Sequence, residues 1–170
     1  MALTLPFDLQ SWIDEHRDLL KPPVGAKRVF EDANFIVMVV GGPNERNDYH
    51  LNDGEEFFYQ LEGEMTLKVV DDGEFKDIPI KAGQVFLLPG GTPHSPQRAA
   101  HSVGLVVERK RMPGEKDGLR WYCESCQHVV FEERFEVVNF LAQMKATMQR
   151  WAGDEELRTC DACGHVNSPS

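Results

Sequence analysis

The sequence is poor in basic residues. Its 170 residues include 18 lysines and arginines against 28 aspartates and glutamates, which gives a formal net charge of −10. A nucleic-acid-binding surface needs a basic face, so this charge argues against a nucleic-acid partner. An anionic substrate stays compatible with it, because a few arginines can reverse the sign of the potential inside a pocket.

Long apolar runs are also missing. No stretch approaches the roughly 18 apolar residues that a membrane-spanning helix requires. The first residues, MALTLPFDLQSW, lack the basic and apolar regions of a secretory signal peptide. We therefore expect a cytoplasmic protein with no membrane partner.

Cysteine is scarce, and no cysteine is left over from two C-x-x-C pairs, Cys123/Cys126 and Cys160/Cys163. Without a secretory signal, this pattern indicates metal binding rather than a disulfide framework. Two such pairs fit a closed tetrahedral site of four thiolates, which we interpret as structural. Zn²⁺ and iron use the same ligands, so the sequence leaves the metal open.

The apolar pattern predicts mainly β-structure. A helix is expected over residues 7–21, followed by Pro22 and Pro23. Short strands with turn signals between them then follow, which is typical of an antiparallel sandwich or barrel. They are expected at residues 29–30, 35–40, 57–61, 65–70, 77–80, 85–88 and 103–108.

A polar connector over residues 113–118 predicts a domain boundary. Residues 1–118 would form the β-domain with its N-terminal helix, and residues 119–170 an appendage that carries the cysteines. The appendage is expected to contain a strand at residues 129–131 and a helix. The packed face of that helix would carry Val137, Leu141, Met144, Met148 and Trp151.

Three side chains form a candidate metal site. His94 follows a predicted strand and its Pro/Gly turn, and His50 and Glu56 flank the turn at residues 52–54. Two histidines and one carboxylate are the ligand set of mononuclear Fe(II) oxygenases. Glu55 is the rival carboxylate, but adjacent residues of a strand point to opposite faces, so only one of the two can face the metal.

Two arginines and one more glutamate extend this set. Arg46 and Arg98 could each form a surface ion pair, but beside a metal site in an acidic protein they are suited to hold a substrate carboxylate. Glu108 ends an apolar strand. It is either the ion-pair partner of Arg109 or Lys110, or a buried acid that contacts the substrate or acts as a base.

The stretch GQVFLLPGGTPH at residues 83–94 is similar to the second sequence motif of the cupin superfamily. The first cupin motif is degraded, because His50 stands alone instead of in an H-x-H pair. Glu56 nevertheless precedes Gly63 by the spacing of that motif. Cupins are double-stranded β-helix, or jelly-roll, barrels, in agreement with the strand series.

More specifically, the runs GGPNERNDYH, EEFFYQLEGEM, FLLPGGTPHSPQR and GLVVERKR resemble the 3-hydroxyanthranilate 3,4-dioxygenase family over nearly the whole chain. The C-terminal WYCESCQH and CDACGH resemble the extra, rubredoxin-like metal site of its bacterial members. The resemblance implies that residues 1–118 are a cupin catalytic domain. The Fe(II) ligands that it implies are His50, Glu56 and His94. Arg46 and Arg98 would hold the substrate carboxylate, Glu56 would also lie at the substrate, and Glu108 would contact its amino or hydroxyl group and could act as a base.

The implied reaction inserts both atoms of O₂ into 3-hydroxyanthranilate and opens its ring. The product is 2-amino-3-carboxymuconate semialdehyde, the precursor of quinolinate in tryptophan breakdown by the kynurenine route and in NAD biosynthesis. The resemblance also implies a homodimer, with the first helix or the strand edges as contacts. Ala26 departs from the family, where an asparagine is expected in a loop near the site, so loop closure or substrate affinity could differ.

Two alternatives remain at this point. One is a cupin dioxygenase for a related aromatic acid, such as a gentisate, or for a catechol. The other is a non-catalytic cupin that binds a small acid and signals through the cysteine appendage.

Overall fold

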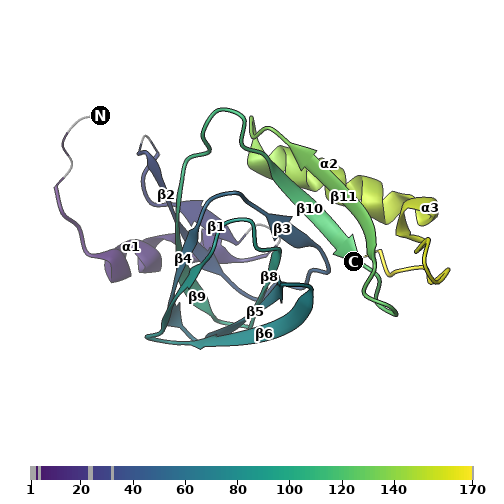
Figure 1. The fold of residues 1–170 in the computed structure, drawn as a ribbon. Helices are drawn as coiled ribbons and strands as arrows, with labels where there is room; N and C mark the ends of the chain where they lie inside the picture. The colour runs from purple at the N-terminus through teal and green to yellow at the C-terminus, as the bar shows by residue number, and fades with distance from the viewer. Residues whose placement is uncertain (1–2, 4, 23–24, 32, 170) are drawn as a thin grey trace.

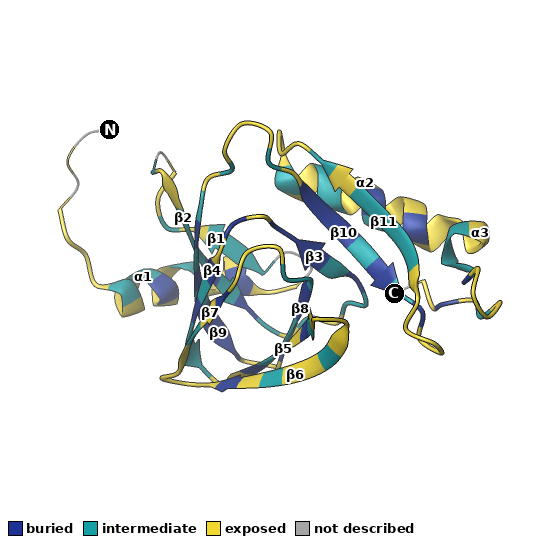
Figure 2. Ribbon diagram, viewed as in Figure 1, coloured by how far each residue is buried: buried dark blue, intermediate teal, exposed yellow. Residues whose placement is uncertain are grey.

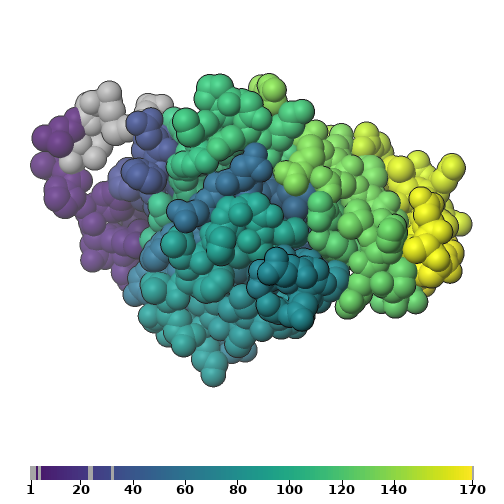
Figure 3. All heavy atoms as spheres, in the orientation of Figure 1, coloured from purple at the N-terminus to yellow at the C-terminus, as the bar shows by residue number. Residues whose placement is uncertain are grey.

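The computed structural model describes residues 3, 5–22, 25–31 and 33–169. Within these ranges the chain forms a short N-terminal helix, two facing antiparallel sheets and a C-terminal unit of strands and helices (Figure 1). No described helix is long and apolar enough to cross a membrane. Figure 3 shows the C-terminal unit as a lobe on one side of the molecule.

The N-terminal helix is shorter than expected. Helix α1 (Leu9–His16) continues into a 3-10 turn, η1 (Arg17–Leu20), in place of one helix over residues 7–21. Asp8 caps α1 by accepting a hydrogen bond from the Ser11 N–H at 2.7 Å. Pro22 follows η1, whereas Pro23 lies outside the described residues.

Eleven described strands form the two sheets. The five-stranded sheet has the order β1 (Ala26–Arg28), β2 (Phe35–Gly41), β9 (Val103–Arg109), β4 (Glu56–Glu62) and β7 (Val85–Leu88). The six-stranded sheet has the order β11 (Val129–Phe135), β10 (Asp117–Tyr122), β3 (Tyr49–Leu51), β8 (His94–Arg98), β5 (Glu64–Asp71) and β6 (Glu74–Lys81). This double-stranded jelly-roll barrel is the predicted fold class.

Alternation along the strands sorts apolar side chains to two faces. Between the sheets lies a core whose buried members are Phe58, Met65, Leu67, Val69, Ile80, Leu88 and Val106. On the outer face of the five-stranded sheet, Val39 and Val103 pack against Ile13 of α1 and Leu20 of η1. The N-terminal helix therefore covers one end of that face.

The C-terminal unit packs around tryptophans. Helix α2 (Phe140–Gly153) and the short α3 (Glu155–Arg158) follow β11. Trp151 of α2 stacks on Trp121 of β10 with ring centroids 4.7 Å apart, and Met144 and Met148 pack beside them. The expected packed face was wrong at one end: Val137 precedes the helix and Leu141 is 51% exposed.

The proposed division at residues 118 and 119 falls inside β10. Gly118, Leu119 and Arg120 pair with β3 of the barrel, and the other edge of β10 pairs with β11. Figure 2 shows β10 largely buried at this junction. The two-domain division stays a prediction, and β10 is the strand that joins the barrel to the C-terminal unit. Ala26, expected in a loop, begins β1 and pairs with Val40.

Candidate metal and substrate site

Three buried side chains meet where β3, β4 and β8 come together. His50 pairs with His94 across β3 and β8, and Glu56 begins β4. Glu56 Oε1 lies 3.4 Å from His50 Nδ1 and 3.3 Å from His94 Nε2. One ligand atom from each residue lies within 4.8 Å of the other two. The structure thus brings together the three predicted metal ligands, and their role as ligands stays a prediction.

Strand alternation separates the two rival carboxylates. Glu56 is 5% exposed and points into the barrel, whereas the adjacent Glu55 is exposed. Only Glu56 belongs to the histidine cluster among the described residues.

In each histidine, the ring nitrogen that faces away from Glu56 makes a hydrogen bond that orients the ring. His94 Nδ1 lies 2.9 Å from the Thr92 carbonyl oxygen, so this nitrogen carries the proton and donates it. His50 Nε2 lies 2.9 Å from Asp117 Oδ2. These hydrogen bonds leave His94 Nε2 and His50 Nδ1 to face the carboxylate, and such bonds orient metal-binding histidines.

The electrostatics of the cluster favour a bound cation. Burial opposes the charged form of His50, but hydrogen bonds with Asp117 and Glu56 outweigh it and raise the pKa of His50 to about 9. Burial also opposes the charged form of Glu56, yet His94 and His50 hold the pKa of that carboxyl well below its usual range. A metal ion that binds here would displace the His50 proton.

Arg98 is buried and Arg46 is partly buried, and the two arginines differ in their partners. Arg46 makes a two-point ion pair with Asp48, in which Nε donates to Oδ1 at 2.9 Å and Nη2 contacts Oδ2. Arg98 is 5% exposed, and its Nη1 has no hydrogen-bond partner among the described residues. Burial and the nearby Arg46 lower the pKa of Arg98 to about 10, so it is charged at neutral pH. A buried cation without a partner is suited to bind an anion.

Arg98 and His94 lie at opposite ends of β8. They are four residues apart, so both side chains point to the same face. On β9, Gly104 precedes Glu108 by four residues in the same way. A Cβ atom on Gly104 would lie 2.7 Å from Arg98 Nη1 and 3.0 Å from Gln60 Oε1. Glycine at this position therefore leaves room for the guanidinium group.

Glu108 is buried beside the cluster of His50, Glu56 and His94. It pairs with Glu56 across β9 and β4, and its Oε2 accepts hydrogen bonds from Arg111 Nη1 at 2.7 Å and Asn52 Nδ2 at 3.1 Å. Burial and the charge of Glu56 raise the pKa of Glu108 in spite of the opposing charge of Arg111. Glu108 is thus placed to share a proton with a group bound beside His50, Glu56 and His94.

The alternative ion pair of Glu108 with Arg109 does not form. Arg109 binds Glu115 instead, with Nη1 donating to Oε2 at 2.6 Å. Adjacent residues of a strand point to opposite faces, so Arg109 cannot follow Glu108 into the barrel. Arg111, beyond the end of β9, forms the ion pair.

Three residues of the site were not identified from the sequence: Asn52, Arg111 and Asp117. Asn52 Nδ2 donates to Glu56 and to Glu108 at 3.1 Å each, although the sequence predicts Asn52 only as a turn residue. Asp117 is fully buried, although its sequence context is the polar connector. The only local signal for Arg111 and Asp117 is the cluster of charged residues around residue 111.

The C-terminal unit also reaches this site. The Phe140 ring, at the start of α2, lies 5.1 Å from the His50 ring between centroids. The unit therefore supplies part of the wall around one predicted metal ligand.

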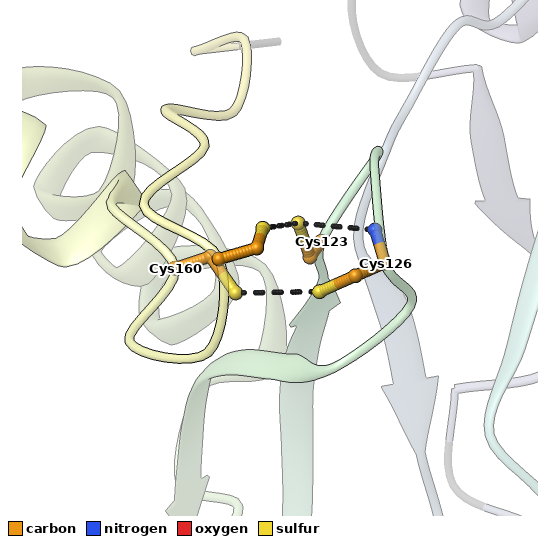
Figure 4. A group of neighbouring side chains, drawn as sticks. Cys123, Cys126 and Cys160 are labelled. Atoms are coloured by element: carbon orange, nitrogen blue, oxygen red, sulfur yellow. Dashed lines mark hydrogen bonds between the residues drawn. The ribbon is translucent and has the colours of Figure 1, made fainter.

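The four cysteines meet in the C-terminal unit (Figure 4). Cys123 Sγ lies 3.6 Å from Cys163 Sγ, and Cys126 Sγ lies 3.6 Å from Cys160 Sγ. A tetrahedral site with metal–sulfur bonds of about 2.3 Å separates its sulfurs by about 3.8 Å. The backbone N–H groups of Ser125 and Cys126 point at the Cys123 sulfur, as they would toward a thiolate. The arrangement fits a four-thiolate metal site.

The sequence matches the family model described as 3-hydroxyanthranilic acid dioxygenase over residues 1–152. A 3-hydroxyanthranilate 3,4-dioxygenase from Xanthomonas euvesicatoria is 56% identical, over 95% of this chain and 92% of that protein. One from Neurospora crassa is 49% identical, over 95% of this chain and 89% of that protein. Among solved structures, a cupin-2 domain protein from Shewanella frigidimarina aligns with a TM-score of 0.46 and 18% identity, over 61% of this chain and all of that one. The match over most of the chain shows that this protein belongs to the 3-hydroxyanthranilic acid dioxygenase family.

Proposed function

We propose that this protein is a 3-hydroxyanthranilate 3,4-dioxygenase that uses Fe(II) held by His50, Glu56 and His94. One observation carries the proposal. A buried cluster of two histidines and one carboxylate shares the barrel with a buried arginine, Arg98, whose Nη1 has no partner among the described residues. The names and the extensive identity of the relatives support the same activity.

The site chemistry matches the substituents of the substrate. 3-Hydroxyanthranilate carries a carboxylate, an amine and a hydroxyl group on adjacent ring carbons. The buried Arg98, with Arg46 nearby, would bind the carboxylate, because guanidinium groups match it in charge and shape. The amine and hydroxyl would then face the metal cluster and Glu108.

Protein side chains would hold the reacting groups in place. Fe(II) bound to this ligand set would supply the redox chemistry that lets O₂ react with an aromatic ring. Glu108, whose pKa is raised by burial and by Glu56, could take the proton from the hydroxyl or amino group. The ring would open to 2-amino-3-carboxymuconate semialdehyde with both oxygen atoms retained, and this product cyclises to quinolinate.

Oxygen uptake tests the proposal directly. Protein loaded with Fe(II) should consume one O₂ per 3-hydroxyanthranilate and yield quinolinate. Gentisate and catechol, which lack the amino group, should react far more slowly. Uptake with these compounds alone would favour a different cupin dioxygenase, and tight binding without uptake would favour a non-catalytic cupin.

A pair of neighbouring variants tests the metal site. Glu56→Ala should lose iron and activity, because it removes the only carboxylate of the cluster. Glu55→Ala is the matched control, since Glu55 is exposed one residue away and should retain both. Iron content measured beside activity would overturn the ligand set if Glu56→Ala kept its metal.

We further propose that the cysteine cluster holds structural Zn²⁺ or iron and that the protein is a cytoplasmic homodimer. A four-thiolate site requires reduced cysteines, which suits a reducing compartment. Phe35, Val85 and Leu87 on the outer face of the five-stranded sheet are between 54% and 62% exposed, which supports a dimer contact on that face. Metal analysis and light scattering on the purified protein test these two points.

A further inference from the structure

Arg111 lies between two buried carboxylates beside the metal cluster. Its side chain is 12% exposed. Nε and Nη2 donate to the two oxygens of Asp117 at 2.6 and 2.5 Å, and Nη1 donates to Glu108 Oε2 at 2.7 Å. All three guanidinium nitrogens are therefore used inside the protein. None of these contacts is with a predicted metal ligand.

Asp117 connects Arg111 to His50, one of the proposed metal ligands. Asp117 is fully buried, and its Oδ2 also contacts His50 Nε2 at 2.9 Å. Arg111 holds both oxygens of Asp117, so it fixes the plane of the carboxylate that orients the His50 ring. Nδ1 of His50 is then directed at Glu56.

The Glu108 side leads back to the same cluster. Asn52 Nδ2 bridges Glu108 Oε2 and Glu56 Oε1 at 3.1 Å each. The contacts close a ring of six side chains: His50, Asp117, Arg111, Glu108, Asn52 and Glu56. Arg111 is the one arginine in this ring, which also contains three buried carboxylates, and it contacts two of them, Asp117 and Glu108.

The ring requires the shape of arginine as well as its charge. Arg111 uses two nitrogens on one carboxylate and the third on another, which a lysine ammonium cannot reproduce in a fixed plane. The neighbouring Arg109 cannot replace it, because it pairs with Glu115.

We propose that Arg111 is a positioning residue that aligns the metal ligand His50, through Asp117, and the pocket acid Glu108 at the same time. The part that concerns Glu108 rests on the proposed function, whereas the part that concerns His50 needs only a bound metal. Hydrogen-bonded partners of metal ligands affect metal affinity by about 10- to 100-fold. Loss of Arg111 should therefore weaken metal binding although Arg111 does not touch the metal.

Metal affinity tests the His50 part without turnover. Competition with a chelator should show an affinity for Fe(II) or Co(II) lowered by about 10- to 100-fold in Arg111→Met. The visible absorption of the Co(II)-substituted protein should change as well. Arg111→Lys retains the charge and should recover folding but only part of the affinity. Arg109→Met is the matched control and should leave metal affinity and spectrum unchanged.

Two further measurements separate positioning from a general structural role. Guanidinium ion added to Arg111→Ala at low, non-denaturing concentration should restore part of the metal affinity. Arg111→Met and Asp117→Asn combined should weaken metal binding by less than the product of their separate effects, because they break the same contact. In turnover, Arg111→Lys should lower kcat more than it raises KM.

Some results would overturn the proposal. If Arg111→Met or Arg111→Lys melted at a lower temperature but kept wild-type metal affinity, Co(II) spectrum and kcat, Arg111 would be structural only. If the wild type did not turn over 3-hydroxyanthranilate, the proposed function would fail, while metal affinity and spectrum would still decide the role of Arg111 toward His50.

Discussion

Arg46 is partly buried and Arg98 is buried, and their different partners give them opposite effects on stability. Arg46 is paired with Asp48 at two points, whereas Arg98 Nη1 has no partner among the described residues. Folding lowers the pKa of Arg98, so the folded protein binds that proton less tightly than the unfolded chain does. At every pH below about 10 the charge on Arg98 therefore opposes folding.

Arg98→Gln should raise stability and remove substrate binding. We expect a gain of about 1–3 kcal/mol in the free energy of unfolding, because a buried charge without a partner is removed. Arg46→Gln should have the opposite effect and cost about 3–5 kcal/mol, because it leaves Asp48 buried without its cation. Thermal unfolding of the two variants beside the wild type checks both signs. A destabilised Arg98→Gln would show that Arg98 has a partner in the free protein.

A substitution at Asn52 should make the stability of the site depend on pH. In Asn52→Asp an oxygen replaces the amide that donates to Glu56 and Glu108, so three carboxylates would meet. We expect a loss of about 1–3 kcal/mol at neutral pH. The pKa of Glu108 is already raised, and a shared proton would relieve the repulsion, so the loss should shrink as the pH falls toward 5. Melting temperatures at several pH values measure this, and a pH-independent difference would contradict it.

At the scale of single elements, β9 carries both ends of the proposed substrate pocket. Its Glu108 lies beside the metal cluster and its Gly104 lies against Arg98. Strand alternation explains why these two residues face inward while Arg109 does not. The four-residue spacing between Gly104 and Glu108 on β9 thus sets the distance between the proposed carboxylate site at Arg98 and the candidate metal site.

Gly104→Ala should reduce substrate affinity with little effect on the metal. The added methyl group would lie 2.7 Å from Arg98 Nη1 and must displace it. We expect KM to rise about 10-fold or more, with iron content unchanged, because about 1.4 kcal/mol of lost binding is tenfold in affinity. Gly153→Ala in α2, where no heavy atom lies within 4 Å of the new Cβ, is the control. An unchanged KM would place the substrate carboxylate away from Arg98.

At the scale of the whole molecule, the cysteine unit and the barrel share hydrogen bonds near Arg46. Trp121 Nε1 of β10 donates to Asn47 Oδ1 at 2.8 Å, and Asn47 Nδ2 donates to the Ser168 carbonyl oxygen at 3.2 Å. Asn47 lies between Arg46 and Asp48 in the sequence. The C-terminal residues after the last cysteine therefore brace the segment that holds Arg46, one of the two arginines proposed to bind substrate.

Loss of the metal proposed at the four cysteines should affect substrate binding in the barrel. Cys163→Ser should lower the melting temperature, because metal binding contributes folding free energy to a small unit. It should also raise KM while the His50, Glu56 and His94 site keeps its iron. Ser125→Ala, in the turn between Cys123 and Cys126, is the control. Unchanged KM in a metal-depleted cysteine site would show that the two parts act independently.

The sequence alone determined which residues could bind metal. His50, Glu56 and His94 were identified from residue type, turn signals and motif spacing. Alternation predicted that only one of Glu55 and Glu56 can face the metal, and the structure shows that Glu56 is the buried one. The two C-x-x-C pairs were identified as a candidate metal site from their spacing alone. Arg46 and Arg98 were singled out from their places near the candidate Fe(II) ligands and Glu108 from its place at the end of an apolar strand, and the family resemblance then gave them roles. The structure buries Arg98 and Glu108 and leaves Arg46 partly buried.

The tertiary structure decided the partners of these residues. The contact of His50 with Asp117 spans 67 positions in the sequence, and that of Asn52 with Glu108 spans 56. Which polar groups meet across strands depends on strand order and register, and these are set by packing of the whole core rather than by local pattern. Arg111 could therefore be recognised as the bridge between Asp117 and Glu108 only after β9, β10 and β3 were in place.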